Sequence, residues 1–108
     1  MYLQLVKYSV KINKVPFGLY LFLFWGDKML NIGICDDIPV FRELIETCIR
    51  QYDEKKGNTF NIRQFGSGEE LLDWLDRKKV CFDLLFLDYY MKKLNGLEAA
   101  KMIRQMEL

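Results

Sequence analysis

Three aspartates carry the strongest chemical signal in this sequence. Asp36 and Asp37 directly follow an apolar segment, and Asp88 ends a second one, DLLFLD at residues 83–88. If both segments are neighbouring parallel strands, the three carboxylates converge at one edge of a sheet. Carboxylates held that close repel one another, so the arrangement favours a bound hard cation such as Mg²⁺. A carboxylate beside such an ion can attack a phosphoryl group, which would give an aspartyl phosphate.

The composition of the chain excludes several other kinds of chemistry. The 108 residues include no histidine, so Ser-His-Asp hydrolysis, Cys-His proteolysis and ordinary zinc catalysis are not expected. A net charge of +1 argues against a protein that binds nucleic acid through its charge. Cys35, Cys48 and Cys81 lie among apolar neighbours without a CxxC spacing, which predicts buried, reduced thiols in a cytoplasmic protein.

The elements that would position these aspartates can be read from the apolar pattern. Residues 30–35, LNIGIC, predict a buried strand, and apolar residues at spacings of three and four from 40 to 52 predict a helix that follows it. Pro39 suits the first turn of this helix, and Asp37 is expected to cap it. Three residues of the helix are expected in the core: Phe41, Leu44 and Cys48.

Two further strand and helix pairs follow. Residues 60–65 predict a strand, after which Ser67 is placed to cap a helix with acidic residues in its first turn. The apolar residues between Asp83 and Asp88 predict a central parallel strand covered on both faces. Asn95-Gly96 then opens a third helix. This alternation predicts an α/β domain with a parallel sheet and right-handed crossovers.

Residues 1–28 differ from the rest of the chain. They hold four Lys and one Asp, against twelve basic and fourteen acidic residues in 29–108. The apolar run at 17–25 is too short to span a membrane, since nine helical residues reach about 14 Å and the hydrocarbon core is about 30 Å thick. The codons for residues 25–28 contain a GGNGA run before Met29, as in a ribosome-binding site. We therefore predict that Met29 is the natural start and that residues 1–28 are a non-domain leader; a membrane-surface or core-packing role is the alternative.

The sequence from Met29 onward resembles the receiver domain of bacterial two-component response regulators. Three motifs carry the resemblance: ICDD at 34–37, FGSGEELL at 65–72 and DLLFLDYYMKKLNGLEAAKMIR at 83–104. The last motif looks most like receivers attached to LytTR-type DNA-binding domains. The resemblance implies a flavodoxin-like doubly wound parallel sheet, of which residues 29–108 would form a partial receiver domain with only the first three β/α units.

The resemblance also implies roles for individual residues. Asp88 would be the phospho-acceptor, Asp37 and Asp88 would bind Mg²⁺ directly, Asp36 would assist through water, and the backbone carbonyl of Tyr90 would complete the protein ligands. Lys92 stands where many family members have proline. The implied partner is a sensor histidine kinase, receiver dimerisation is a second option, and neither nucleic-acid contact nor a membrane span is expected. The chain would be a substrate rather than an enzyme.

One alternative remains open at this stage. The Ser or Thr and the Lys with which the family senses the phosphoryl group cannot be assigned to residues of this chain. The chain could therefore be a truncated, phosphorylation-incompetent fragment that acts only by binding a kinase or another receiver. Incubation with acetyl phosphate and Mg²⁺ distinguishes the two interpretations.

Overall fold

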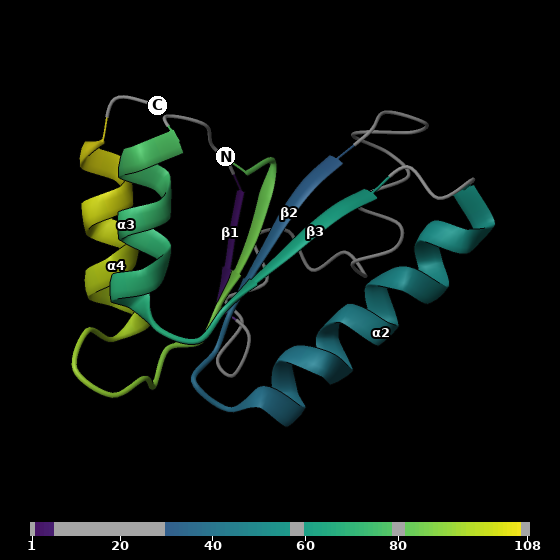
Figure 1. The fold of residues 1–108 in the computed structure, drawn as a ribbon, viewed down its shortest axis with the longest axis horizontal. Coiled ribbons are helices and arrows are strands. Elements are labelled where there is room, and N and C mark those ends of the chain that lie inside the picture. Colours follow the sequence, from purple (N-terminus) through teal and green to yellow (C-terminus); the bar gives the residue numbers. More distant parts are fainter. Residues whose placement is uncertain (1, 6–29, 57–59, 79–81, 107–108) are drawn as a thin grey trace.

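The computed structural model describes residues 2–5, 30–56, 60–78 and 82–106. Within these ranges, parallel strands form one sheet in the order β1-β4-β2-β3. The strands are β1 (Tyr2–Leu5), β2 (Leu30–Cys35), β3 (Phe60–Phe65) and β4 (Leu84–Leu87). Helix α2 (Pro39–Lys56) covers one face of the sheet, and α3 (Gly68–Lys78) and α4 (Gly96–Gln105) cover the other (Figure 1).

The alternation of strands and helices confirms the predicted α/β class. Strands β2, β3 and β4 each precede a helix, and β2 lies between the other two. This order is that of a partial flavodoxin-like fold. All four residues of β4 are buried, as expected for a strand with helices on both sides of its sheet.

Strand β1 joins the same sheet from the beginning of the chain. It pairs in parallel with β4, with Leu3 opposite Leu85 and Leu5 opposite Leu87. The apolar run at 17–25 and the predicted start at Met29 lie outside the described residues. The assignment of residues 1–28 to a leader therefore stays a prediction, although the structure places the short strand Tyr2–Leu5 in the sheet.

The sheet separates two apolar clusters. On the side of α3 and α4, side chains of β4 such as Leu85 and Leu87 pack against Leu71 and Ile103. On the side of α2, Ile32 and its neighbours form the second cluster. Alternate residues of the central strands therefore serve opposite faces, which fixes the register of these strands against both helical layers. No helix in the described part of the chain is long and apolar enough to cross a membrane.

The predicted core face of α2 is wrong in part. Phe41, Leu44 and Cys48 are exposed, with Leu44 60% accessible, whereas Ile49 is buried against the sheet. At 100° per residue, Cys48 lies about 100° and Leu44 about 140° around the helix axis from Ile49. The apolar stripe is wider than the line along which α2 meets the sheet. The same finding overturns the prediction that Cys48 is a buried thiol, and Cys81 lies outside the described residues.

The predicted cap at Ser67 is confirmed, and Asn95-Gly96 opens α4 as predicted. Ser67 Oγ accepts the Glu70 N–H at 3.0 Å, and Asn95 forms a reciprocal capping box with Glu98 at the start of α4. The prediction that Asp37 caps α2 is wrong. Its Oδ2 atom instead accepts the backbone N–H of Lys92 at 3.2 Å, because the loop after β4 lies against it.

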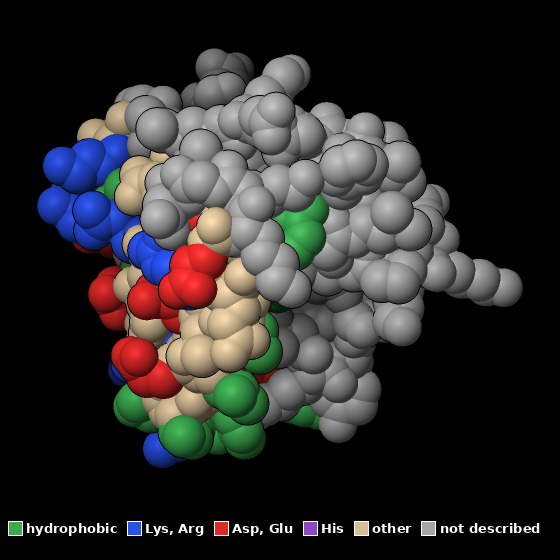
Figure 2. Space-filling model, turned by 90° about the vertical axis from the view of Figure 1, so that its right-hand side faces the viewer, with side chains coloured by type: hydrophobic (Ala, Val, Ile, Leu, Met, Phe, Trp, Pro, Cys, Tyr) green, Lys and Arg blue, Asp and Glu red, His purple; other side chains and the backbone are tan. Residues whose placement is uncertain are grey.

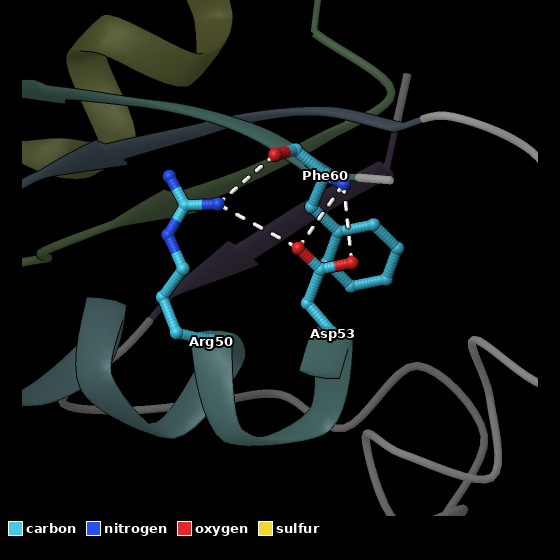
Figure 3. A network of polar contacts seen from close by, with 3 residues as sticks. All are labelled: Arg50, Asp53 and Phe60. Atoms are coloured by element: carbon cyan, nitrogen blue, oxygen red, sulfur yellow. Dashed lines mark hydrogen bonds and ion pairs between the residues drawn. The ribbon is translucent and has the colours of Figure 1, made fainter. Parts of the chain in front are cut away.

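A polar network that sequence reasoning missed ties the end of α2 to the start of β3 (Figure 3). Asp53 is fully buried, and its two carboxylate oxygens lie 3.1 and 3.2 Å from the N–H of Phe60. Arg50 donates to the Phe60 carbonyl at 3.0 Å and lies 3.6 Å from Asp53. The sequence held one clue to this network. Asp53 follows Ile49 by four residues, so the two side chains lie on the same, sheet-facing side of the helix.

Candidate functional site

The acidic site lies where β2 and β4 end at the same edge of the sheet. The two strands are in register, with Cys35 opposite Leu87. The Asp88 N–H donates to the Cys35 carbonyl at 2.9 Å, and the Asp36 N–H donates to the Phe65 carbonyl at 3.2 Å. These backbone bonds extend the sheet by one step and bring the residues after both strands side by side.

The three aspartates predicted from the sequence meet at this edge. One carboxylate oxygen from each of Asp36, Asp37 and Asp88 lies within 4.8 Å of the others. Asp36 and Asp88 are fully buried, whereas Asp37 is partly exposed and opens the cluster to solvent. Three carboxylates gathered at this distance form a site that favours a divalent cation.

Backbone donors orient these carboxylates. Asp88 Oδ1 accepts the N–H of Tyr90 at 3.1 Å, and Asp36 Oδ1 accepts the N–H of Ile38 at 3.0 Å. Both are bonds from an aspartate to the residue two positions on, which is the geometry of an Asx turn. With the bond from Lys92 to Asp37, each aspartate accepts at least one backbone N–H group. The structure thus orients all three side chains through loop backbone.

Arg42 is a further polar residue at the site that sequence reasoning missed. Its Nη1 atom donates to the Asp36 carbonyl at 2.7 Å, and its Nε atom donates to the Gln64 side chain at 3.2 Å. The guanidinium therefore ties the loop after β2 to strand β3. Its position in the first turn of α2 was the only available signal, and a charged residue at the start of a helix is common without any role in a site.

The loop between Asp88 and α4 packs tightly on itself. Gly96 donates its N–H to the Tyr89 carbonyl at 3.0 Å, and a Cβ on Gly96 would lie 2.2 Å from the Asp88 carbonyl oxygen. The glycine with which α4 opens is therefore required by the close approach of two backbone segments. The left-handed conformation in this loop falls on Lys93 instead, at φ 62°.

The thiol nearest the site is held neutral. Burial, with the negative charges of Glu70, Asp36 and Asp88, raises the pKa of Cys35 to about 12. The Cys35 Sγ atom lies 3.3 Å from the Ser67 carbonyl and 3.6 Å from the Met91 sulfur. Cys35 thus lies beside a carbonyl oxygen and another sulfur atom, and it is not one of the grouped side chains of the acidic cluster. The atoms that converge at this edge are carboxylate oxygens of Asp36, Asp37 and Asp88.

An oxygen-only set of this size fits Mg²⁺. Two oxygens bound to one Mg²⁺ lie about 3 to 4 Å apart, because each bond of the octahedron is about 2.1 Å long. The 4.8 Å limit for the three aspartates lies slightly above this range. The wider spacing is accommodated if some of the carboxylates bind the ion directly and another binds it through a water molecule.

Comparison with known proteins identifies the family. The model of the response regulator receiver domain matches residues 32–108. The cyclic di-GMP phosphodiesterase response regulator RpfG of Xanthomonas campestris pv. campestris is 34% identical over 85 residues, 76% of this chain. A protein described as probable histidine kinase 6 of Oryza sativa subsp. japonica is 32% identical over 78 residues, 72% of this chain.

These matches define how far the likeness extends. The chain spans 21% of the length of the first relative and 7% of the second. No solved structure matches this chain. The matched model is that of receiver domains in general, and neither relative's name points to the LytTR-type subgroup, so the finer assignment made from residues 83–104 is not supported.

Proposed function

This chain belongs to the response regulator receiver domain family, and from this we propose that Asp88 accepts a phosphoryl group in a phosphorelay. The observation that carries the proposal is the position of Asp88, buried at the end of the central strand and within 4.8 Å of two further carboxylates. A carboxylate oxygen of Asp88 forms a new bond to phosphorus while the bond from phosphorus to the donor's imidazole nitrogen breaks. The electron pair of that bond stays on the imidazole.

We propose Mg²⁺ as the cofactor of this site, with Asp37 and Asp88 as direct ligands, Asp36 as a ligand through water and the Tyr90 backbone carbonyl as a further ligand. The bound ion would offset the negative charge of the phosphoryl oxygens as they approach the carboxylates. The Tyr90 N–H fixes Asp88 through Oδ1, so the carboxylate is oriented before the donor arrives.

The chain itself is in this proposal a substrate of the donor rather than an enzyme. Phosphorylation replaces one negative charge at Asp88 with a more highly charged group that has several acceptor oxygens. The N–H groups of the loop after β4 already bond to the aspartates, as Tyr90 does to Asp88 and Lys92 does to Asp37. A change of charge there can therefore reorganise this loop.

Acetyl phosphate with Mg²⁺ tests the acceptor directly. We expect the full chain to gain the mass of one phosphoryl group and peptide mapping to place it on Asp88. Asp88→Asn should abolish the gain, whereas Asp73→Asn, which alters an exposed acid on α3, should leave it unchanged. Absence of phosphate on Asp88, with binding to a histidine kinase retained, would support the interaction-only alternative instead.

We propose a histidine kinase as the donor and the start of α2 as its docking surface. Ile38, Val40, Phe41 and Leu44 are exposed there, and Ile38 follows Asp36 by only two residues. In Figure 2 hydrophobic side chains gather at the lower end of the described part of this face. An apolar patch beside the acceptor suits a partner that must bring its phosphoryl group to Asp88.

A charge placed in this patch separates docking from chemistry. Leu44→Glu should lower the rate of transfer from a phosphorylated histidine kinase by about tenfold, because a charge would be buried at the contact. The rate with acetyl phosphate should stay the same, since Leu44 is not part of the acidic cluster. Equal loss with both donors would show that the variant damages the site itself and would contradict the docking surface.

A further inference from the structure

The loop that joins β4 to α4 donates alternate backbone N–H groups to carboxylates. The bonds run from Tyr90 to Asp88 at 3.1 Å, from Lys92 to Asp37 at 3.2 Å and from Leu94 to Glu69 at 3.1 Å. Asp37 and Asp88 belong to the acidic cluster, whereas Glu69 lies outside it. The far end of the loop is therefore held by a carboxylate that is not part of the cluster.

Glu69 stands in the first turn of α3, which begins at the same end of the sheet as this loop (Figure 1). The start of α3 packs closely on the loop, since a Cβ on Gly68 would lie 3.1 Å from Leu94 Cδ2 and 3.3 Å from the Leu94 carbonyl oxygen. Leu94 also packs against the apolar cluster on this side of the sheet. The bond from Leu94 to Glu69 is thus one part of a close contact between α3 and the loop.

The backbone of Lys93 shows why the loop needs contacts on both sides. Lys93 has a φ of 62° and lies between the N–H groups of Lys92 and Leu94, each of which is bonded to a carboxylate. A residue with a side chain adopts this left-handed conformation at a cost in energy, so the surrounding contacts must hold it there. Without the bond to Glu69, the turn at Lys93 would be free to relax and would shift the residues before it.

We propose that Glu69 is a positioning residue of the acidic site. By accepting the Leu94 N–H, it keeps the loop after β4 against the carboxylates, so that loop N–H groups orient Asp37 and Asp88. Residues that hold a metal ligand in place change the affinity for the metal without touching it. The effect on cation binding rests on the proposed function, whereas the effect on the loop does not.

Amide hydrogen exchange, measured by NMR on the full chain without Mg²⁺, tests the effect on the loop. Glu69→Ala should raise the exchange rates of the Tyr90, Lys92 and Leu94 amides by about tenfold, because the loop loses its bond to α3. Glu69→Gln should match the unaltered protein, since its amide oxygen can still accept the Leu94 N–H. A rise at Leu94 alone would overturn the proposal, because Glu69 would then hold only its own donor.

Glu70→Ala is the matched control. Glu70 follows Glu69 in the first turn of α3 and likewise accepts one backbone N–H, that of Gly66 at 3.0 Å. The variant removes the same charge from the same turn but no bond to the loop after β4. It should raise the exchange rate of Gly66 and leave the three loop amides unchanged. Equal effects of Glu69→Ala and Glu70→Ala on the loop amides would assign them to the stability of α3 and would contradict the positioning role.

Titration with Mg²⁺, followed through the chemical shifts of the same amides, measures the effect on cation binding. Glu69→Ala should raise the dissociation constant by about tenfold, as for residues that orient metal ligands. Glu69→Gln and Glu70→Ala remove the same charge and should show only a smaller, electrostatic increase. A dissociation constant for Glu69→Ala equal to theirs would overturn the role of Glu69 in the site. If the unaltered protein bound no Mg²⁺, the proposed metal site would fail, while the exchange rates would still decide whether Glu69 holds the loop.

Discussion

Gly96 shows how closely the backbone packs behind Asp88. The first residue of α4 lies against the Asp88 carbonyl, and its N–H bonds to the carbonyl of Tyr89. A side chain at this position must push against backbone, which has little freedom to yield. The position of α4 and the position of Asp88 are consequently coupled through a residue with no side chain.

Gly96→Ala should therefore destabilise the protein by about 3 kcal/mol, because the added Cβ would lie 2.2 Å from the Asp88 oxygen. Gly66→Ala is the matched control. A Cβ at Gly66 would meet only side-chain atoms at 3.5 Å, an ordinary contact, and should change stability by less than about 0.5 kcal/mol. Urea unfolding of both variants measures the difference, and similar losses in both would contradict the close approach.

Cys35 gives a prediction for the dependence of stability on pH. Its pKa is raised from 9.0 to about 12 in the folded protein, chiefly by burial. The stabilising effect of the neutral thiol is complete below pH 9 and is lost as the pH rises towards 12, since the unfolded chain gives up its proton first. The loss should be about 1.4 kcal/mol per pH unit in this window.

The free energy of unfolding is measured for the unaltered protein and for Cys35→Ser between pH 8 and about 10.5. The other titrating groups are the same in both proteins, so the difference between them isolates the effect of Cys35. The difference in unfolding free energy between the two should shrink above pH 9. Alkylation at pH 8, followed by peptide mass spectrometry, gives a second check: the exposed Cys48 should react and Cys35 should not until the protein is denatured. A constant difference across the pH range would show that the Cys35 thiol does not resist ionisation.

At the scale of elements, the position of α2 depends on both ends of the helix. Arg42 ties its start to the loop after β2, and Asp53 ties its end to β3. Between these points the helix contacts the sheet along the line of Ile45, Ile49 and Tyr52. Val40, Phe41 and Leu44, in its first half, are exposed. The helix therefore keeps an apolar outer surface beside the acidic site without losing its place on the sheet.

Asp53→Ala should destabilise the protein by about 1 to 3 kcal/mol, because it leaves the buried N–H of Phe60 without its carboxylate acceptor. Asp73→Ala is the matched control. Asp73 forms an exposed pair with Arg77 at 2.9 Å, and such pairs contribute less than about 0.5 kcal/mol. Chemical denaturation of the two variants compares a buried with an exposed aspartate, and equal losses would argue against the network in Figure 3.

At the scale of the whole molecule, the two clusters of apolar residues support a sheet whose edge is strongly acidic. A ligand that binds only the folded state stabilises it, so Mg²⁺ at ten times its dissociation constant should add about 1.4 kcal/mol to the free energy of unfolding. Thermal unfolding with MgCl₂, compared with NaCl at the same ionic strength, measures this gain.

The same measurement on Asp88→Asn should show little or no gain, because one of the converging carboxylates is then neutral. Ser67→Ala is the control, since it removes a helix cap and lowers stability without touching the acidic cluster. It should keep the full response to Mg²⁺. An equal response in Asp88→Asn and the unaltered protein would place the ion elsewhere.

The order of strands and helices, the burial of β4 and the caps at Ser67 and Asn95 were all predictable, since each follows from residues close together in sequence. The convergence of Asp36, Asp37 and Asp88 followed from one general rule about parallel sheets, once both segments were recognised as strands. Periodicity and strand-end position are local properties, and they fixed the class of the fold and the composition of the site.

Only the tertiary structure decided which side of an apolar stripe is covered and which backbone segments touch. Leu44 and Ile49 look alike in the pattern of α2, yet the sheet covers one and leaves the other exposed. The bond from Lys92 to Asp37 and the pairing of β1 with β4 join residues far apart in the chain, and the contact of Gly96 with Asp88 depends on how the loop between them folds back. Such contacts depend on how complete elements meet in space, and that is set by the packing of the whole sheet rather than by any local run of residues.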